Sequence, residues 1–138
     1  MALWWTVFGD PGRPDPFHDA LTPILQRLAP ELLDAPDTDG PDAPTPYALD
    51  LEARISEIER SGHFGPVHHE TIPWTRRHSA AQIRALFASY SPWLALPPHR
   101  RAVVLDELEQ LAIEDFGGTV ERPYLTPIYI ATRPSNRR

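Results

Sequence analysis

The sequence of 138 residues contains neither cysteine nor lysine, so all thirteen of its basic residues are arginine. The absence of cysteine excludes disulfide scaffolds, thiolate metal sites and cysteine nucleophiles. No apolar run approaches the ~18 residues of a membrane span. The apolar N-terminus also lacks the basic leader and the small-residue cleavage site of a signal peptide. We therefore expect a cytoplasmic protein.

An excess of positive charge is lacking as well. The formal net charge is -6 and the isoelectric point is about 5.4. Binding to nucleic acid or to an anionic membrane surface needs a basic patch, so both are disfavoured. The hydrophobic fraction of 41% is enough for the core of a single domain spanning residues 1–138.

The sequence motifs of several common active sites are missing. There is no Gly-x-Ser-x-Gly nucleophile elbow. The segment Gly9-Asp10-Pro11-Gly12 follows a predicted strand, but it has neither the glycine pattern of a dinucleotide site nor the Lys-Ser/Thr pair of a phosphate loop. Neither serine-based acyl transfer nor nucleotide-phosphate binding is therefore predicted.

A cluster of histidines and one carboxylate offers a weak metal-binding pattern. It comprises His63, His68, His69, Glu70 and His78. On a strand His68 and Glu70 would share a face while His69 points away, and no helical His-x-x-x-His pair exists. The pattern favours solvated histidines on an edge strand. A metal site and a general base remain the two alternatives.

Hydrophobic periodicity and turn residues predict strands and helices in the order β-α-loop-α-β-α-α-β. The acidic, proline-rich loop has no large apolar residue, so we expect it to be mobile. The predicted elements are a strand at 3–8, a helix at about 22–29 after a short turn begun by Asp15-Pro16, a loop at about 34–46, a helix from the cap Asp50 to the stop Gly62, a strand at 67–76, a helix behind the capping box Ser79/Gln82, a helix at about 99–114 stopped by Gly117-Gly118, and a strand at 119–133.

Three details of this pattern carry structural expectations. Leu3 to Phe8 is apolar without alternation, as in a strand buried on both faces. Pro23 interrupts the first helix, so we expect that helix to begin at Thr22. Pro73 lies inside the strand at 67–76, which indicates an edge strand or a bulge.

The chain is unusually rich in aromatic side chains, which either build the core and an interface or line an apolar ligand pocket. They include Trp4, Trp5, Phe8, Trp74, Tyr90 and Trp93. Phe8-Gly9-Asp10-Pro11 comes at the carboxyl end of a predicted strand, where open α/β sheets place their ligand crevices. We therefore predict that Trp5, Phe8, Asp10 and Trp74 bind a substrate. No catalytic or metal-binding residue is predicted.

Several segments, taken in order, resemble the C-terminal half of a class I S-adenosylmethionine-dependent methyltransferase of the small-molecule type. The segments are Leu3-Trp4-Trp5-Thr6-Val7-Phe8-Gly9-Asp10-Pro11, Phe17-His18-Asp19-Ala20-Leu21, Trp74-Thr75-Arg76-Arg77, Tyr90-Ser91-Pro92 with Leu96-Pro97, Arg100-Arg101-Ala102-Val103-Val104-Leu105, and Tyr124-Leu125-Thr126 to Thr132-Arg133-Pro134. The resemblance implies an α/β fold with part of a Rossmann-like sheet, in which mutually antiparallel strands follow the order 5-7-6 and helices flank the sheet.

The resemblance assigns Leu3 to Phe8 to strand 5, Val67 to Arg76 to strand 6 and Thr119 to Arg133 to strand 7. It places strand 6 at the edge, which suits its proline. Strand 7 would be internal, where Pro123 and Pro127 each remove a ladder donor. We therefore expect a bulge there, or a strand that effectively starts near Tyr124.

The family binds its cofactor through a glycine-rich turn after strand 1 and an acidic residue after strand 2. Since the chain begins at strand 5, S-adenosylmethionine is implied by the resemblance while its binding motif is absent. We expect the substrate-side portion of a methyltransferase that acts on a small molecule and is inactive as an isolated chain. The alternative is a non-catalytic binding or dimerisation module derived from one.

Strand 5 of the family normally pairs with strand 4, so Leu3 to Phe8 would leave an open apolar edge. We expect self-association through this edge, or pairing with a separate N-terminal subunit.

Overall fold

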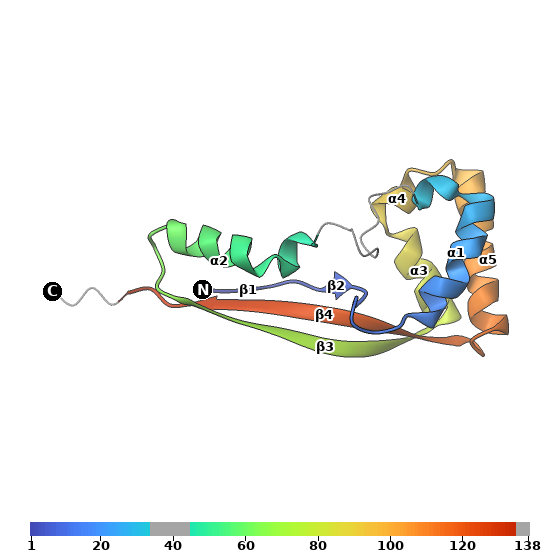
Figure 1. Cartoon of the computed structure of the whole chain (residues 1–138). Helices are drawn as coiled ribbons and strands as arrows, with labels where there is room; N and C mark the ends of the chain where they lie inside the picture. The colour runs from blue at the N-terminus through green and yellow to red at the C-terminus, as the bar shows by residue number, and fades with distance from the viewer. Residues whose placement is uncertain (34–44, 135–138) are drawn as a thin grey trace.

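The computed structural model describes residues 1–33 and 45–134, which form an α/β fold around a four-stranded antiparallel sheet. Two long strands, β3 (Val67–Ser79) and β4 (Thr119–Ala131), make an extended ribbon (Figure 1). Two short strands, β1 (Ala2–Trp4) and β2 (Val7–Phe8), pair with the other side of β4. The helices are α1 (Pro16–Leu28), α2 (Leu51–Arg60), α3 (Ala80–Ala88), α4 (Ser91–Leu94) and α5 (Pro98–Glu114), with short 3₁₀ turns at Pro30–Leu32 and Tyr47–Leu49.

The order of the strands is the one that the family resemblance implies. The last strand lies between the N-terminal strands and β3, and every pair is antiparallel, as predicted. Two details of the prediction are wrong. β4 begins at Thr119 rather than near Tyr124, and its register shows no bulge, because Trp4 opposite Ile128 and Val7 opposite Leu125 belong to one continuous alignment.

The predicted N-terminal strand is divided into two because of a proline on its partner. Trp5 donates its N–H to the carbonyl of Pro127 at 3.3 Å, but Pro127 has no N–H to return the bond. The same one-sided pairing occurs where Gly9 donates to Pro123 at 3.1 Å. In both prolines the backbone position that lacks an N–H therefore faces β1 and β2. The ladder between β4 and β3 remains intact.

Pro73 lies on the outer edge of the sheet, as the sequence indicated. It is opposite Leu125 of β4. Odd-numbered residues of β4 direct their backbone groups toward β1 and β2, as the bonds at Pro123 and Pro127 show. Their partners on β3 must then direct theirs outward. The missing N–H of Pro73 consequently faces away from β4 and costs no ladder bond.

The first helix runs through its proline, so the prediction of a helix starting at Thr22 is wrong. Helix α1 begins at Pro16 and keeps Phe17, Leu21 and Leu25 buried on one face on both sides of Pro23. That continuous apolar contact outweighs one lost backbone bond.

Local signals at the other helix ends are confirmed. Asp50 accepts a hydrogen bond from the N–H of Ala53 at the start of α2. Ser79 and Gln82 form the complete capping box of α3. After α5, Gly117 and Gly118 have φ angles of 63° and 82°, which side chains rarely tolerate, so they turn the chain into β4.

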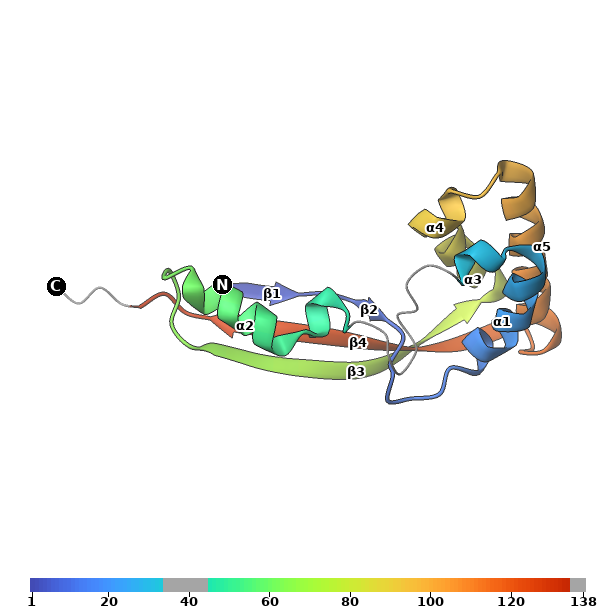
Figure 2. The same cartoon turned by 45° about the horizontal axis from the view of Figure 1, so that its top comes forward.

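Two apolar clusters lie at opposite ends of the ribbon. The larger joins α1, α3 and α5 to the start of β4, and the smaller packs α2 against Tyr129 and Ala131. Helices α1, α3 and α5 stand at one end of the ribbon, and α2 lies along the other end (Figures 1 and 2). The predicted inward face of α5 is buried, namely Val104, Leu105, Leu108, Leu111 and Ala112.

The prediction that Leu3 to Phe8 is buried on both faces is wrong for the described residues. Side chains alternate along a strand, and α2 covers only the face that bears Leu3 and Trp5. On the opposite face Trp4 is 66% and Phe8 52% exposed. The predicted acidic loop at about 34–46 falls mostly outside the described residues. Within the described part of the chain, no helix is both long and apolar enough to cross a membrane.

Candidate functional site

The candidate site begins with the turn that follows β2. Gly9 has a φ of 89°, and the carboxylate of Asp10 accepts a bond from the N–H of Gly12 at 2.9 Å. The same carboxylate pairs with Nε of Arg13 at 2.6 Å. The turn therefore closes on itself and aims the guanidinium of Arg13 at the sheet.

Arg13 fastens this turn to the long ribbon. Its Nη2 donates to the carbonyls of Trp74 at 2.7 Å and Tyr124 at 3.0 Å, and its Nη1 donates to Oγ1 of Thr75 at 2.9 Å. One side chain thus joins the turn to both β3 and β4. With Asp10 as its counter-ion, Arg13 serves to position the turn and has little capacity left for a ligand.

A second ion pair lies where the turn becomes helix α1. Asp15 caps that helix by accepting from the N–H of His18 at 3.2 Å, and its other oxygen accepts from Nε of Arg122 at 2.7 Å. The Arg122 and Asp15 side chains are only 9% and 14% exposed. The guanidinium also lies 5.5 Å from the centre of the Phe87 ring and 5.9 Å from that of Phe17. The ion pair of Asp15 and Arg122 therefore holds the first turn of α1 against β4.

Aromatic rings form a row across three strands. Phe8 of β2 and Trp74 of β3 are both opposite Tyr124 of β4. The rings of Trp74 and Tyr124 stack at 4.6 Å, and those of Phe8 and Tyr124 meet at 5.6 Å. Tyr90, from the segment after α3, lies 5.5 Å from Phe8. Tyr124 is buried at the centre of the row, and Phe8, 52% exposed, presents an apolar surface at the carboxyl end of β2.

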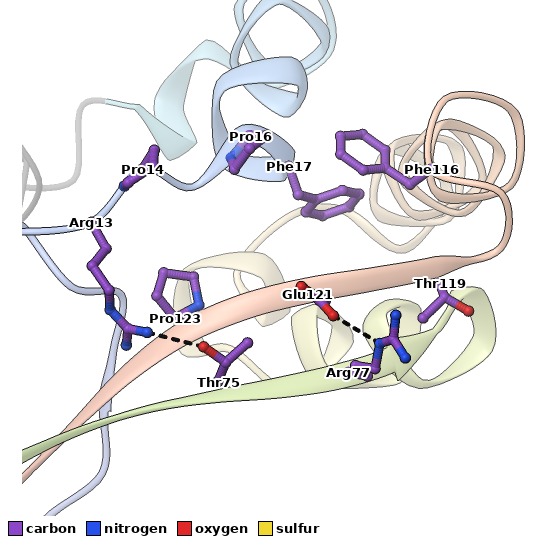
Figure 3. A pocket seen from close by; sticks show the side chains of 10 residues that line it. All are labelled: Arg13, Pro14, Pro16, Phe17, Thr75, Arg77, Phe116, Thr119, Glu121 and Pro123. Carbon is purple, nitrogen blue, oxygen red and sulfur yellow. Dashed lines mark hydrogen bonds and ion pairs between the residues drawn. The ribbon is translucent and has the colours of Figure 1, made fainter.

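Two hollows flank the Arg13-Pro14 segment. The smaller, of about 210 Å³, is lined by Phe8, Gly9, Asp10, Pro11, Arg13, Pro14, Asp15, His18, Asp19 and Arg122. The larger, of about 540 Å³, is lined by Arg13, Pro14, Pro16, Phe17, Thr75, Arg77, Phe116, Thr119, Glu121 and Pro123 (Figure 3). The smaller hollow is the candidate functional site, because it combines the exposed ring of Phe8 with the polar groups of the turn.

The structure brings together three of the four predicted substrate-binding residues. Phe8 and Trp74 share the aromatic row, and Asp10 reaches the backbone of Trp74 through Arg13. Trp5 lies elsewhere, on the opposite face of the sheet. Its ring packs against Tyr47 at 6.0 Å and Tyr129 at 5.9 Å. An odd spacing of three residues separates Trp5 from Phe8, and residues at odd spacing point to opposite faces of a strand.

Burial shifts the pKa values of two tyrosines in the aromatic row and of the histidine beside it. It lowers the pKa of His78, and the positive charges of Arg76 and Arg122 lower it further. Burial also raises the pKa of Tyr124, and it raises the pKa of Tyr90 to about 12. At neutral pH His78 is therefore uncharged and shares a hydrogen bond of 2.8 Å between its Nε2 and the hydroxyl of Tyr124.

This burial predicts a pH dependence of stability. As the pH falls below 6.5, the ordinary value for histidine, the unfolded chain takes up the proton before buried His78 does. The stabilising contribution is thus complete above that pH and is lost as the pH falls through the folded pKa. We expect the free energy of unfolding to decrease between pH 7 and pH 5, measured by urea titration.

His78→Gln should reduce this dependence of the free energy of unfolding on pH, and His63→Gln, at an exposed position, should leave it unchanged. An equal slope in His78→Gln and wild type would contradict the assignment.

The predicted histidine cluster is not a single group. His63, His68 and His69 are exposed, as the favoured interpretation expected, but His78 is buried and the expectation of a solvated side chain is wrong there. It lies on the face of β3 that packs against Tyr124. Among residues 1–33 and 45–134, no group of three or more histidine, aspartate or glutamate side chains is arranged to hold a metal ion.

Sequence reasoning did not select Arg13, Arg122 or Tyr124 as site residues. Arg122 had a detectable signal, because it lies two residues from Tyr124 and therefore on the same face of the strand, between two apolar inward positions. A charged residue at such a position needs a buried partner. Arg13 had no such signal, since its partners come from distant strands.

No family model and no curated protein matches this chain.

Proposed function

We propose that this chain is the substrate-side portion of a class I S-adenosylmethionine-dependent methyltransferase that acts on a small molecule. The observation that carries the proposal is the order of the strands. In the family that the motifs resemble, strand 7 lies antiparallel between strands 5 and 6. Here β4 lies antiparallel between β1–β2 and β3, with a proline on the outer edge of β3. The coarse α/β arrangement is common to many proteins, so the order of the strands and the motifs support the proposal jointly.

The location of the candidate site supports the same proposal. The turn after β2 lies at the carboxyl end of the strand assigned to strand 5, where open α/β sheets bind their ligands. The exposed ring of Phe8 lines the hollow and suits a flat, largely apolar molecule, and the stacked rings of Tyr124 and Trp74 support it from behind. Phe8 and the polar groups of the turn would bind and orient the methyl acceptor, and methyl transfer depends chiefly on such positioning.

The turn of the candidate site does not fit the cofactor itself. S-adenosylmethionine would need backbone donors from a glycine-rich turn, but the turn at Gly9–Arg13 uses its own. Gly9 donates to Pro123, Gly12 to the side chain of Asp10, and Arg13 to the carbonyl of Asp10. The cofactor must therefore be held by residues other than these, and no chemical step is assigned to this chain alone.

Two measurements test the proposal. Calorimetry with the 138-residue chain should detect no binding of S-adenosylmethionine with a micromolar dissociation constant. A chimera that joins this chain to strands 1–4 of a characterised small-molecule methyltransferase should bind the cofactor and give a folded monomer. Micromolar binding by the chain alone, or a chimera that is unfolded while its parent folds, would contradict the proposal.

A non-catalytic binding or dimerisation module is the second candidate function. It is favoured by the outer edge of β1 and β2, with which no other described strand pairs, and by the exposed rings of Trp4 and Phe8 beside that edge. Failure of the chimera together with a stable association of the chain with itself would favour this candidate over the first.

A further inference from the structure

The two edges of the sheet differ in how they meet solvent. The β3 edge carries Pro73, whose missing N–H faces outward, and exposed charged residues such as Glu70 and Arg77. Proline and charge are the usual means by which proteins prevent an edge from pairing with another chain. The β1–β2 edge has neither between residues 2 and 8.

The backbone groups available on the β1–β2 edge can be assigned from the ladder. Leu3, Trp5, Val7 and Gly9 direct their backbone groups toward β4. The even-numbered residues must then direct theirs outward. Among the described residues, nothing pairs with the outward N–H and carbonyl groups of Trp4, Thr6 and Phe8. These three residues lie in an extended segment that ends at Gly9, where φ becomes positive.

An apolar strip continues from this edge onto β4 on one face of the sheet, and exposed His68 and Glu70 of β3 lie on its far side, opposite Ile130 and Ile128. Trp4 is opposite Ile128, Ala2 is opposite Ile130, and Thr126 is opposite Ile72. Trp4, Ile130 and Ile72 are 66%, 49% and 39% exposed. No described helix packs on them. This face and the free edge would be covered together by an added strand that brings apolar side chains of its own.

We infer that the edge pairs with a second copy of this chain, as an antiparallel strand centred on Thr6. The segment is uncharged, so two copies meet there without the repulsion that a net charge of -6 imposes on most of the surface. A two-fold axis at Thr6 places Trp4 opposite Phe8 of the second copy, twice. The exposed rings then form cross-strand aromatic pairs on one continuous face.

The inference rests on the sheet edge and is independent of the proposed methyltransferase function. The dimer and the methyltransferase proposal involve the same edge. A family member would pair its strand 4 with β1–β2, and a second copy of this chain would need that same edge. The chimera described above should therefore be monomeric, while the 138-residue chain is dimeric. A monomeric chain would refute the dimer and leave the methyltransferase proposal standing.

Sedimentation equilibrium measures the assembly directly. We expect twice the chain mass of 15.6 kDa. Thr6→Pro removes only an outward N–H and should weaken the dimer at least about tenfold, because two symmetric hydrogen bonds are lost. The circular dichroism spectrum should be unchanged. A monomeric wild-type chain, or a dimer that Thr6→Pro leaves intact, would overturn the inference.

The absence of cysteine provides a second, independent test. In an antiparallel hydrogen-bonded pair the Cα atoms are about 5.5 Å apart, which a disulfide spans. Thr6→Cys should therefore form a covalent dimer on mild oxidation that a reductant reverses. Ser61→Cys, at an exposed turn after α2, serves as the matched control and should remain monomeric in a denaturing gel. Equal cross-linking of both variants would refute pairing at Thr6.

Discussion

Arg122→Met should lower the free energy of unfolding by about 3 kcal/mol, because it leaves the carboxylate of Asp15 without its partner in a largely buried position. The two side chains meet at 2.7 Å and are 9% and 14% exposed. Methionine can fill the space against the rings of Phe17 and Phe87, so the loss would come mainly from the unpaired charge. Urea unfolding followed by circular dichroism measures the change.

A double-mutant cycle separates the ion pair from packing. Asp15→Asn keeps a side-chain oxygen that can cap α1, but it removes the charge. In the Arg122→Met background Asp15→Asn should therefore recover part of the lost stability, whereas alone it should destabilise by leaving Arg122 unpaired. Strictly additive effects of the two substitutions would show that the charges do not interact.

A matched control lies on the same two strands. Arg77 and Glu121 are also opposite each other on β3 and β4 and form an ion pair at 2.8 Å, but their side chains are 75% and 57% exposed. Arg77→Met should cost well under about 1 kcal/mol, since water screens the pair. The contrast between the two arginines tests whether burial gives the Arg122 pair its effect.

The local elements of the fold could be predicted because their signals lie within a few residues. The caps at Asp15 and Asp50, the capping box at Ser79 and the glycines after α5 act on neighbouring backbone groups. The order of the strands was expected from the family resemblance, since periodicity alone does not pair strands that are more than 100 residues apart in sequence.

The rest depended on long-range register. The missing N–H of Pro127 interrupts only the ladder to the neighbouring strand that it faces. A shift of the strand register by one residue would turn it toward the other neighbour. The same alternation put Trp5 on the face opposite Phe8 and brought Tyr124 between Phe8 and Trp74. The sequence therefore predicted the turn at Asp10 as part of the candidate site. It did not predict that Tyr124, Arg13 and Arg122 contribute to it.

Phe17→Ala should have the second large effect, a loss of about 3–5 kcal/mol in the free energy of unfolding. Phe17 is fully buried at the first turn of α1. Its ring meets that of Phe116 at 5.4 Å, in the turn after α5 (Figure 3). It also meets the ring of Phe87 at 6.2 Å, so it joins α1 to α3. Alanine would leave a cavity between the rings of Phe87, in α3, and Phe116, in the turn after α5, and such a cavity collapses only in part.

Two controls distinguish the cavity from a general effect of substitution. Phe17→Leu keeps most of the apolar volume and should cost clearly less than alanine. Ile113→Ala, on the half-exposed face of α5, should cost less than about 1 kcal/mol. Urea titrations of all three variants give the comparison. Similar losses for Phe17→Ala and Ile113→Ala would mean that the packing of α1 does not depend on Phe17.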